Sequence, residues 1–275
     1  MIDDLNQFVL ERLSAYLNDF STYISKEMVR EFSKSVDFDD REIIIYLIAD
    51  MLKYDRYVVD NYLLPGLKEL DNSVYENDLY YKNIKFGNIK RNKWSLKHHK
   101  YEPYELFVYN DIFVDEKGRT VPQIGYFKKV YKYPVICEND REWMMVTPNE
   151  IETMKEPISN AFGNVLTFGL GLGYFAYMAS LKENVKSITI VEKDKDAILL
   201  FEENILPQFE NKSKIKIIQD DAFTFEYDSN DYDYVFVDIW HDPSDGVEAY
   251  KYFKEREKEN VKYDYWALKT LKVYM

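Results

Sequence analysis

The sequence predicts an α/β fold in which a doubly wound parallel sheet follows a helical region and a small antiparallel β region. Three observations support this prediction. Short apolar segments alternate with amphipathic ones from residue 164 onward, and a glycine-rich turn follows the first of them. The chain before them changes from a helical to a strand-like pattern near residue 80. Alternating strands and helices build a parallel sheet with right-handed crossovers.

Four strands are predicted in the C-terminal half. Each is a short run rich in β-branched or aromatic residues: 164–168, 187–191, 214–218 and 234–237. Helical spacing follows three of them, at 174–182, 194–206 and 247–259. A further helix, 147–160, leads into the first strand and begins with a capping box, in which Thr147 is the cap and Glu150 its partner. We assign this domain to residues 148–275.

Two regions precede that domain. Apolar residues at a spacing of three to four predict helices over 2–20, 25–33 and 40–54, in a helical region of residues 1–75. Shorter runs separated by turn residues predict an antiparallel sheet within residues 80–147, with strands at 105–109, 112–114, 123–127, 135–138 and 143–146. The helices show no chemistry, and we expect them to form a cap or a homodimer surface.

The charge of the chain argues against nucleic acid as a partner. The formal net charge is −13, and a broad face that binds a polyanion needs the opposite sign. One basic cluster surrounds Trp94: Lys82, Lys85, Lys90, Arg91, Lys93, Lys97, His98, His99 and Lys100. We favour a solvated hairpin face for this cluster over a site for an anionic ligand.

The composition predicts a cytoplasmic protein without a membrane span. No run of about 18 apolar residues occurs, and the acidic N-terminus lacks the basic segment of a secretory signal. Cys137 is the single cysteine, and its apolar neighbours indicate a buried structural thiol. Cys-x-x-Cys and His-Glu-x-x-His are absent, so we predict no metal site.

The glycine turn is the first candidate functional feature. Gly169, Gly171 and Gly173 alternate directly after the strand that ends at Phe168. Glycine adopts positive φ and lets a ligand approach bare backbone, while the N–H groups of the next helix point back at the turn. The turn therefore predicts a seat for a nucleotide or a carboxylate, although tight turning alone also explains such a pattern.

Acidic residues follow the other strands, at the sheet edge where ligands bind. Glu192 lies 19 residues beyond Gly173, the spacing at which a carboxylate takes ribose hydroxyls. The others are Asp220, Asp221 and Ala222 after the third strand, and Asp238 and His241 after the fourth. Each has a structural explanation on its own, such as a helix start, a strand end or a loop histidine. Their conjunction at one edge predicts a site.

The glycine turn, the Asp221-Ala222 pair and the stretch 238–243 resemble the motifs of class I S-adenosylmethionine-dependent methyltransferases. Within that superfamily the pattern is most similar to the spermidine synthase branch, over about residues 130–255. The resemblance implies a Rossmann-like sheet, the class I methyltransferase fold, with S-adenosylmethionine as cofactor. The family normally has seven strands, so we expect a sheet that is short at one edge.

The resemblance also implies roles for individual residues. The glycines pass the methionine part of the cofactor, Glu192 holds the ribose hydroxyls, and Asp221 meets the adenine. The predicted cofactor-binding set is Phe168, Gly169, Gly171, Gly173, Glu192, Lys193, Asp220, Asp221, Ala222 and Asp238. Asp238, beside the transferred group, is the first candidate for a catalytic base, and His241 is the second.

We predict methyl transfer to an unidentified small molecule or protein. Aminopropyl transfer from decarboxylated S-adenosylmethionine is the first alternative, but Leu172 stands where that branch has an aspartate. Gly171-x-Gly173-x-x-Ala176 also fits a dinucleotide fingerprint, so an NAD-dependent oxidoreductase is a second alternative. A non-catalytic nucleotide-binding protein is a third.

Overall fold

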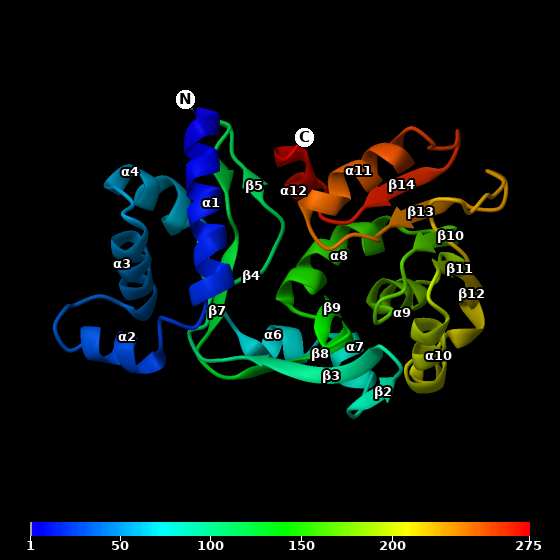
Figure 1. Ribbon diagram of the computed structural model, residues 1–275, viewed down its shortest axis with the longest axis horizontal. Coiled ribbons are helices and arrows are strands. Elements are labelled where there is room, and N and C mark those ends of the chain that lie inside the picture. Colours follow the sequence, from blue (N-terminus) through cyan, green and yellow to red (C-terminus); the bar gives the residue numbers. More distant parts are fainter. Residues whose placement is uncertain (1) are drawn as a thin grey trace. The chain divides into compact units, whose positions relative to one another are not determined.

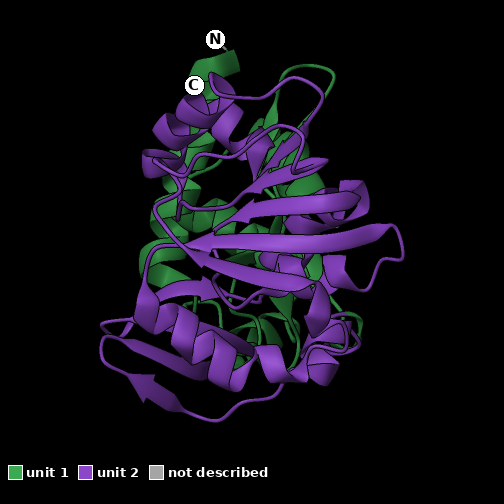
Figure 2. Cartoon of the chain, turned by 90° about the vertical axis from the view of Figure 1, so that its right-hand side faces the viewer, with its two compact units in different colours: residues 1–74, 100–132 green, residues 75–99, 133–275 purple. Residues whose placement is uncertain are grey.

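The computed structural model describes residues 2–275, which fall into two compact units (Figure 2). The first contains the residues up to Val74 and Lys100–Lys132, and the second contains Tyr75–His99 and Tyr133–Met275. Each unit therefore combines segments that are distant in the sequence. Whether the predicted segments 1–75, 80–147 and 148–275 fold as separate domains stays a prediction.

The first unit begins with the three predicted helices. They are α1 Ile2–Phe20, α2 Lys26–Phe32 and α3 Asp40–Leu52. Ser25 caps α2, and Asp39 caps α3 in a capping box in which Glu42 accepts from the Asp39 N–H. The apolar faces of the helices form one buried cluster together with Tyr54 and Tyr62.

Beyond α3 the first unit contains short helices and a strand that the sequence did not predict, followed by strands within the predicted runs 105–109, 112–114 and 123–127. The chain passes through α4 Arg56–Val58, the π-helix η1 Val59–Leu63 and α5 Leu64–Gly66. Strand β1 Leu67–Leu70 then pairs in parallel with β7 Ile124–Phe127, whose other neighbour is β4 Phe107–Val108. β5 Phe113–Val114 and β6 Thr120–Val121 form a two-stranded sheet. Strand β1 buries only its two ends, so it lacks the alternation by which strands are recognised.

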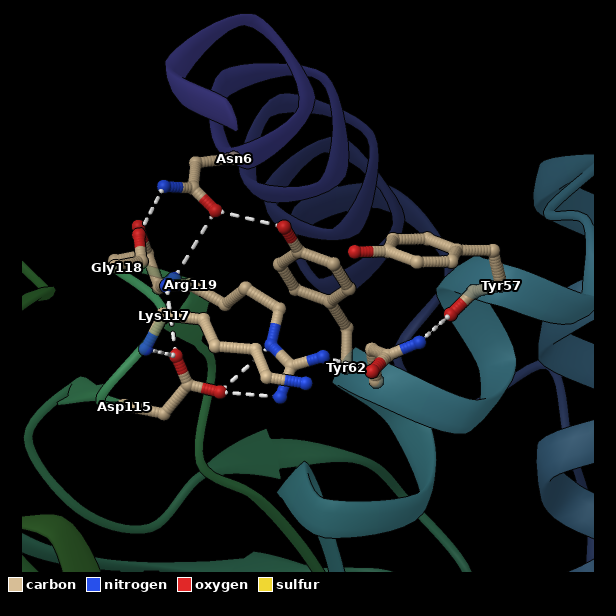
Figure 3. Close-up of polar contacts among 9 residues, drawn as sticks. Asn6, Tyr57, Tyr62, Asp115, Lys117, Gly118 and Arg119 are labelled. Atoms are coloured by element: carbon tan, nitrogen blue, oxygen red, sulfur yellow. Dashed lines mark hydrogen bonds and ion pairs between the residues drawn. The ribbon is translucent and has the colours of Figure 1, made fainter. Parts of the chain in front are cut away.

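A polar network fixes the turn between β5 and β6 to α1 and η1 (Figure 3). Asn6 of α1 is 7% exposed, donates to the Gly118 carbonyl over 2.9 Å and accepts from the Tyr62 hydroxyl over 2.8 Å. Arg119 pairs with Asp115 at 2.5 Å, and the Asp115 carboxylate also accepts backbone N–H groups within the turn. Such satisfied networks hold a loop in one conformation.

The second unit opens with two short helices and an antiparallel sheet. The helices are α6 Asn72–Glu76, whose last two residues belong to this unit, and α7 Leu79–Asn83. The sheet has the order β2-β3-β8-β9, with β2 Ile89–Arg91, β3 Trp94–Tyr101, β8 Tyr131–Glu138 and β9 Arg141–Met145. The prediction of a single antiparallel sheet within residues 80–147 is wrong, since its strands divide among three sheets. Alternation and turn residues locate strands but do not determine their partners.

Five parallel strands form the central sheet of the second unit (Figure 1). They are β10 Gly163–Phe168, β11 Val185–Glu192, β12 Ile215–Gln219, β13 Tyr234–Val237 and β14 Lys262–Tyr265. Their order is β12-β11-β10-β13-β14, and every neighbouring pair is parallel. This is the order of a doubly wound sheet, whose winding reverses between β10 and β13. The four predicted strands are confirmed, and β14 adds a fifth near the C-terminus.

Helices cover both faces of this sheet. They are α8 Pro148–Asn160, α9 Tyr174–Ser180, α10 Lys195–Asn204, α11 Pro243–Lys254 and α12 Leu268–Val273. In β13, Phe236 stacks on Phe175 of α9 with ring centroids 4.4 Å apart, whereas Val237 joins a cluster with Phe253 of α11. Because successive side chains of a strand point to opposite faces, α9 and α11 lie on opposite sides of the sheet.

Helix α11 begins four residues before the predicted start at Val247. Asp242 caps it, Pro243 occupies its first position, and Asp245 completes a capping box. The apolar periodicity begins only at Val247, whereas the capping residues that start the helix precede it.

Cys137 is buried in β8, as its sequence context predicts, and burial raises the pKa of its thiol. A thiol in such surroundings packs as a small apolar residue. Across residues 2–275, no helix has both the length and the apolar character that crossing a membrane requires.

We predict that Asn6→Ala lowers the free energy of unfolding by about 1–3 kcal/mol, because it leaves buried partners such as the Tyr62 hydroxyl without a hydrogen bond. Chemical denaturation followed by circular dichroism measures the change. Gln7→Ala, at an exposed position on the same helix, is the control and should be nearly neutral. Equal stability of the two variants would show that the network does not hold the turn.

Candidate functional site

The glycine turn joins β10 to α9 through three residues with left-handed backbone. The φ angle is +97° at Gly169, +49° at Gly171 and +73° at Gly173. A Cβ at Gly169 would lie 2.0 Å from the carbonyl oxygen of Asp238, and a Cβ at Gly173 would lie 2.4 Å from the ring of Phe201. Both the φ angles and the available space therefore require glycine. The turn brings the end of β10 against the residue that follows β13.

A segment from far upstream in the chain holds this turn. The hydroxyl of Tyr80 in α7 is buried and donates to the Leu172 carbonyl over 2.6 Å, across 92 residues of sequence. Tyr174, the first residue of α9, donates to the Asp78 carboxylate over 3.1 Å, and its ring centroid is 5.5 Å from that of Tyr80. Sequence reasoning missed Asp78 and Tyr80, because no local pattern connects them to the turn.

Glu192 ends β11 beside the glycine turn. Its Oε1 accepts from the Asp194 N–H over 2.8 Å. Burial raises the pKa of the Glu192 carboxyl, while hydrogen bonds from the backbone N–H groups of Asp194, Leu170 and Lys193 act in the opposite direction. The Gly169 N–H donates to the carbonyl of Val191, the residue before Glu192, over 3.0 Å, so the structure brings Glu192 and the turn together. Lys193 contributes its backbone here, and its side chain is exposed.

The residues that follow β12 lie at the same carboxyl edge of the sheet, where a backbone hydrogen bond connects them to Glu192. The N–H of Asp220 donates to the carbonyl of Glu192 over 3.1 Å. Asp220 and Asp221 are both exposed, and Ala222 is partly buried. The Asp221 carboxylate accepts from the Phe223 N–H over 2.9 Å and so stabilises a local turn. A contact between Asp221 and adenine stays a prediction.

Asp238 leaves β13 with its backbone still paired to β10. Its N–H donates to the Phe168 carbonyl over 3.0 Å. Burial raises the pKa of the Asp238 carboxyl to about 7, so this group can exchange a proton at physiological pH. Phe168 reaches the site only through its backbone, because its side chain is buried with its ring 5.0 Å from that of Phe253.

His241 lies in the loop between Asp238 and α11. Its backbone N–H donates to the Asp245 carboxylate over 3.2 Å, and its Nδ1 lies 3.8 Å from Oδ2 of the same group. The imidazole meets the ring of Trp143 edge-on, with centroids 4.0 Å apart. Its Nε2 is buried and has no hydrogen-bond partner in the part of the chain that the structure describes. An unpaired ring nitrogen is able to accept a proton.

Strand β9 lies over the glycine turn, which the sequence did not indicate. A Cβ at Gly171 would lie 3.1 Å from Cγ of Met144 in this strand. Trp143, the preceding residue, is the ring that contacts His241. The sequence placed β9 in a region separate from the sheet, so neither side chain was a candidate. Both adjoin the predicted site.

Glu150 is a further residue whose surroundings the sequence did not predict. The predicted capping box of α8 is wrong, because the Thr147 side chain makes no capping hydrogen bond. Glu150 is instead only 5% exposed, and its Oε1 has no hydrogen-bond partner within residues 2–275. Burial, followed by the charge of Asp238, raises the pKa of the Glu150 carboxyl well above its usual value.

The basic cluster of residues 82–100 is paired with carboxylates in several places. Lys93 lies 2.6 Å from Glu138 and 2.8 Å from Asp194, and Arg91 lies 2.6 Å from Glu203. These ion pairs agree with the solvated-face interpretation, since they neutralise charge that an anionic ligand would require. In the described residues, no group of three or more His, Cys, Asp and Glu side chains is placed to hold a metal ion.

No protein-family model matches the chain, and no curated protein matches it. Among solved structures, the crystal structure of a proposed O-methyltransferase from Klebsiella pneumoniae is similar to it, at 16% sequence identity and a TM-score of 0.26. The similarity covers 34% of this chain and 44% of the other, so it spans less than half of that protein. A likeness at this TM-score carries no argument for fold or activity. The doubly wound sheet is therefore assigned from the strand order of the structure itself.

Proposed function

We propose that this chain is an S-adenosylmethionine-dependent methyltransferase that acts on a small molecule or a protein. The observation that supports this most directly is the position of Glu192 beside the glycine turn, where the Gly169 N–H donates to the carbonyl of Val191, the residue before Glu192, over 3.0 Å. A left-handed glycine turn beside a strand-end carboxylate, at the carboxyl edge of a doubly wound sheet, suits the ribose of a nucleoside.

The residues at this edge fit an adenosyl group. The three glycines let the turn pack closely against the Asp238 carbonyl, Met144 and Phe201, which fixes its backbone at this edge. The Glu192 carboxylate has about four acceptor positions, so it can bind ribose hydroxyls besides its backbone donors. Asp221 is exposed and Ala222 partly buried, as residues that meet an adenine from solvent would be.

When bound, S-adenosylmethionine supplies a methyl group activated by a sulfonium. The residues of this chain would then position the acceptor and remove its proton. Asp238 suits the removal of a proton, because a base is most effective when its pKa lies close to the working pH, and burial raises its pKa to about 7. His241 is the second candidate, through its unpaired Nε2.

Leu172 favours methyl transfer over aminopropyl transfer. It is fully buried, at 0% exposure, at the position where the aminopropyltransferase branch has an aspartate. An apolar side chain in that place offers no acceptor to the ammonium of a propylamine donor, and an unpaired ammonium is costly to bury.

We predict that Glu192→Ala binds S-adenosylhomocysteine about 10- to 150-fold more weakly than the wild type. The variant loses hydrogen bonds to a charged group, worth about 1.5–3 kcal/mol. Isothermal titration calorimetry measures the affinity, and Glu202→Ala, at an exposed position on α10, is the control. Unchanged affinity in Glu192→Ala would remove this residue from the ribose site.

The same calorimetry with the wild type distinguishes the alternative functions. Binding of S-adenosylmethionine and S-adenosylhomocysteine is the expected result. A clear preference for decarboxylated S-adenosylmethionine would indicate aminopropyl transfer, and binding of NAD alone would indicate an oxidoreductase. If none of the four ligands binds, the methyltransferase proposal fails.

We predict that Asp238→Asn keeps its affinity for S-adenosylhomocysteine but lowers kcat about 100-fold or more, because the amide cannot accept the proton. Wild-type activity should rise with pH through about 7, as Asp238 becomes ionised. Rates are measured with an acceptor found by screening candidates against labelled methyl donor. Asp231→Asn, at an exposed turn position, is the control, and full activity of Asp238→Asn would exclude it as the base.

A further inference from the structure

The carboxyl of Glu150 is buried without the helix-capping contact that would explain it. It lies in the first turn of α8, where an exposed acid commonly bonds back to the cap residue. Here it is 5% exposed, and its Oε1 has no hydrogen-bond partner among residues 2–275. A buried acid without a partner is rare in folded proteins, because desolvation of a polar group costs free energy. Since helix capping does not explain why the Glu150 carboxyl is buried, its burial requires a different reason.

The course of the chain brings Glu150 to the carboxyl edge of the sheet. Helix α8 has 13 residues and strand β10 has 6, so each spans about 20 Å. The helix runs opposite to the strands, because Asn160 at its end bonds to Asp264 within β14, whereas Thr153 bonds to Trp266 just after β14. The first turn of α8 therefore lies level with the last residue of β10, which is hydrogen-bonded to Asp238.

Two hydrogen bonds tie this part of α8 to the end of β13. The Trp266 side chain donates from Nε1 to the Thr153 hydroxyl over 3.0 Å. The Trp266 backbone N–H donates to the Val237 carbonyl, also over 3.0 Å. Thr153 lies one helical turn beyond Glu150, and Val237 immediately precedes Asp238. The two carboxyls thus face the same end of the sheet from adjacent elements.

The titratable groups that face Glu150 are acids. Asp238 follows β13, Tyr80 lies in α7 and Tyr174 begins α9, where its hydroxyl donates to Asp78. Burial together with the charge of neighbouring acids raises the pKa of Glu150, Tyr80 and Tyr174, whereas burial alone raises the pKa of Asp78. Two carboxyls in such surroundings do not both ionise readily, and they titrate as a pair.

We propose that Glu150 is a positioning residue whose charge is coupled to that of Asp238, so that the two carboxyls together carry one proton and Asp238 receives the proton of the acceptor. The acceptor N–H or O–H gives its proton to the ionised member, and the electron pair of that bond stays on the acceptor atom. Both carboxyls are then neutral, and one proton leaves to solvent before the next turnover. The transfer of the acceptor's proton to this pair rests on the proposed function. The prediction that the two carboxyls hold one proton between them does not.

Carboxyl titration by NMR, with ¹³C-labelled Glu and Asp and neither cofactor nor acceptor present, tests the pair. In the wild type, the charge of Asp238 should raise the titration midpoint of Glu150. In Asp238→Asn, this midpoint should fall by one pH unit or more, and Asp238→Ser serves if that variant does not fold. Glu152→Gln, two positions along the same helix, is the control and should leave the Glu150 midpoint unchanged.

An unchanged Glu150 midpoint in the folded Asp238 variant would overturn the proposal. Calorimetry with S-adenosylhomocysteine separates this result from failure of the proposed function. If the carboxyls are coupled but no adenosyl ligand binds, the methyltransferase proposal fails while the proton-sharing pair stands.

The stability of the protein provides a second test. Because the pKa of Glu150 is raised in the folded state, the folded protein holds more protons than the unfolded chain above a pH of about 4.3. Stability contributed by the protonated group is therefore lost as the pH rises. Between pH 5 and 8, we expect the melting temperature of the wild type to fall relative to that of Glu150→Gln. Parallel curves would contradict a raised pKa at Glu150.

Discussion

Two backbone segments meet at the carboxyl edge of the central sheet, and the candidate site depends on how closely they approach. A Cβ at Gly169 would lie 2.0 Å from the Asp238 carbonyl oxygen, so only glycine permits the contact. Strand β13 is in register with β10 up to the pair Phe168–Val237, and the Asp238 N–H continues this pairing. The Asp238 backbone is thus positioned by the sheet itself, which gives a strand-end carboxyl a defined place beside the turn.

The electrostatics of this edge follow from the same packing. Asp78, Glu150 and Asp238 come from three different elements, and burial is the largest cause of the raised pKa of each. Carboxyls in low-dielectric surroundings keep their protons to a higher pH, and neighbouring negative charge strengthens this effect. Such groups reduce stability at neutral pH, so their presence together at a strand edge fits a functional role better than a structural one.

The sequence predicted the four strands of the sheet and the residues at their ends, because the apolar runs and the glycines are local signals. The sequence could not determine whether the side chain or the backbone of a residue lies at the carboxyl edge of the sheet. Phe168 was a predicted binding residue, but its side chain belongs to the core and only its carbonyl meets Asp238. Glu150 shows the converse. The letters of a capping box are present, but tertiary burial places the carboxyl elsewhere, and only the packing of α8 against the sheet shows it.

The predicted domain of residues 148–275 contains the sheet but not everything that shapes its edge. The Leu172 carbonyl is held by the Tyr80 hydroxyl, and Tyr174 is held by Asp78. Met144 of β9 lies where a side chain at Gly171 would have to go. Contacts of this kind join residues far apart in the sequence, so periodicity and motif spacing cannot reveal them. The site is therefore a property of the whole second unit, in which the segment 75–99 packs with residues 133–275. A glycine turn isolated from that upstream segment would lose the hydrogen bond from the Tyr80 hydroxyl to the Leu172 carbonyl.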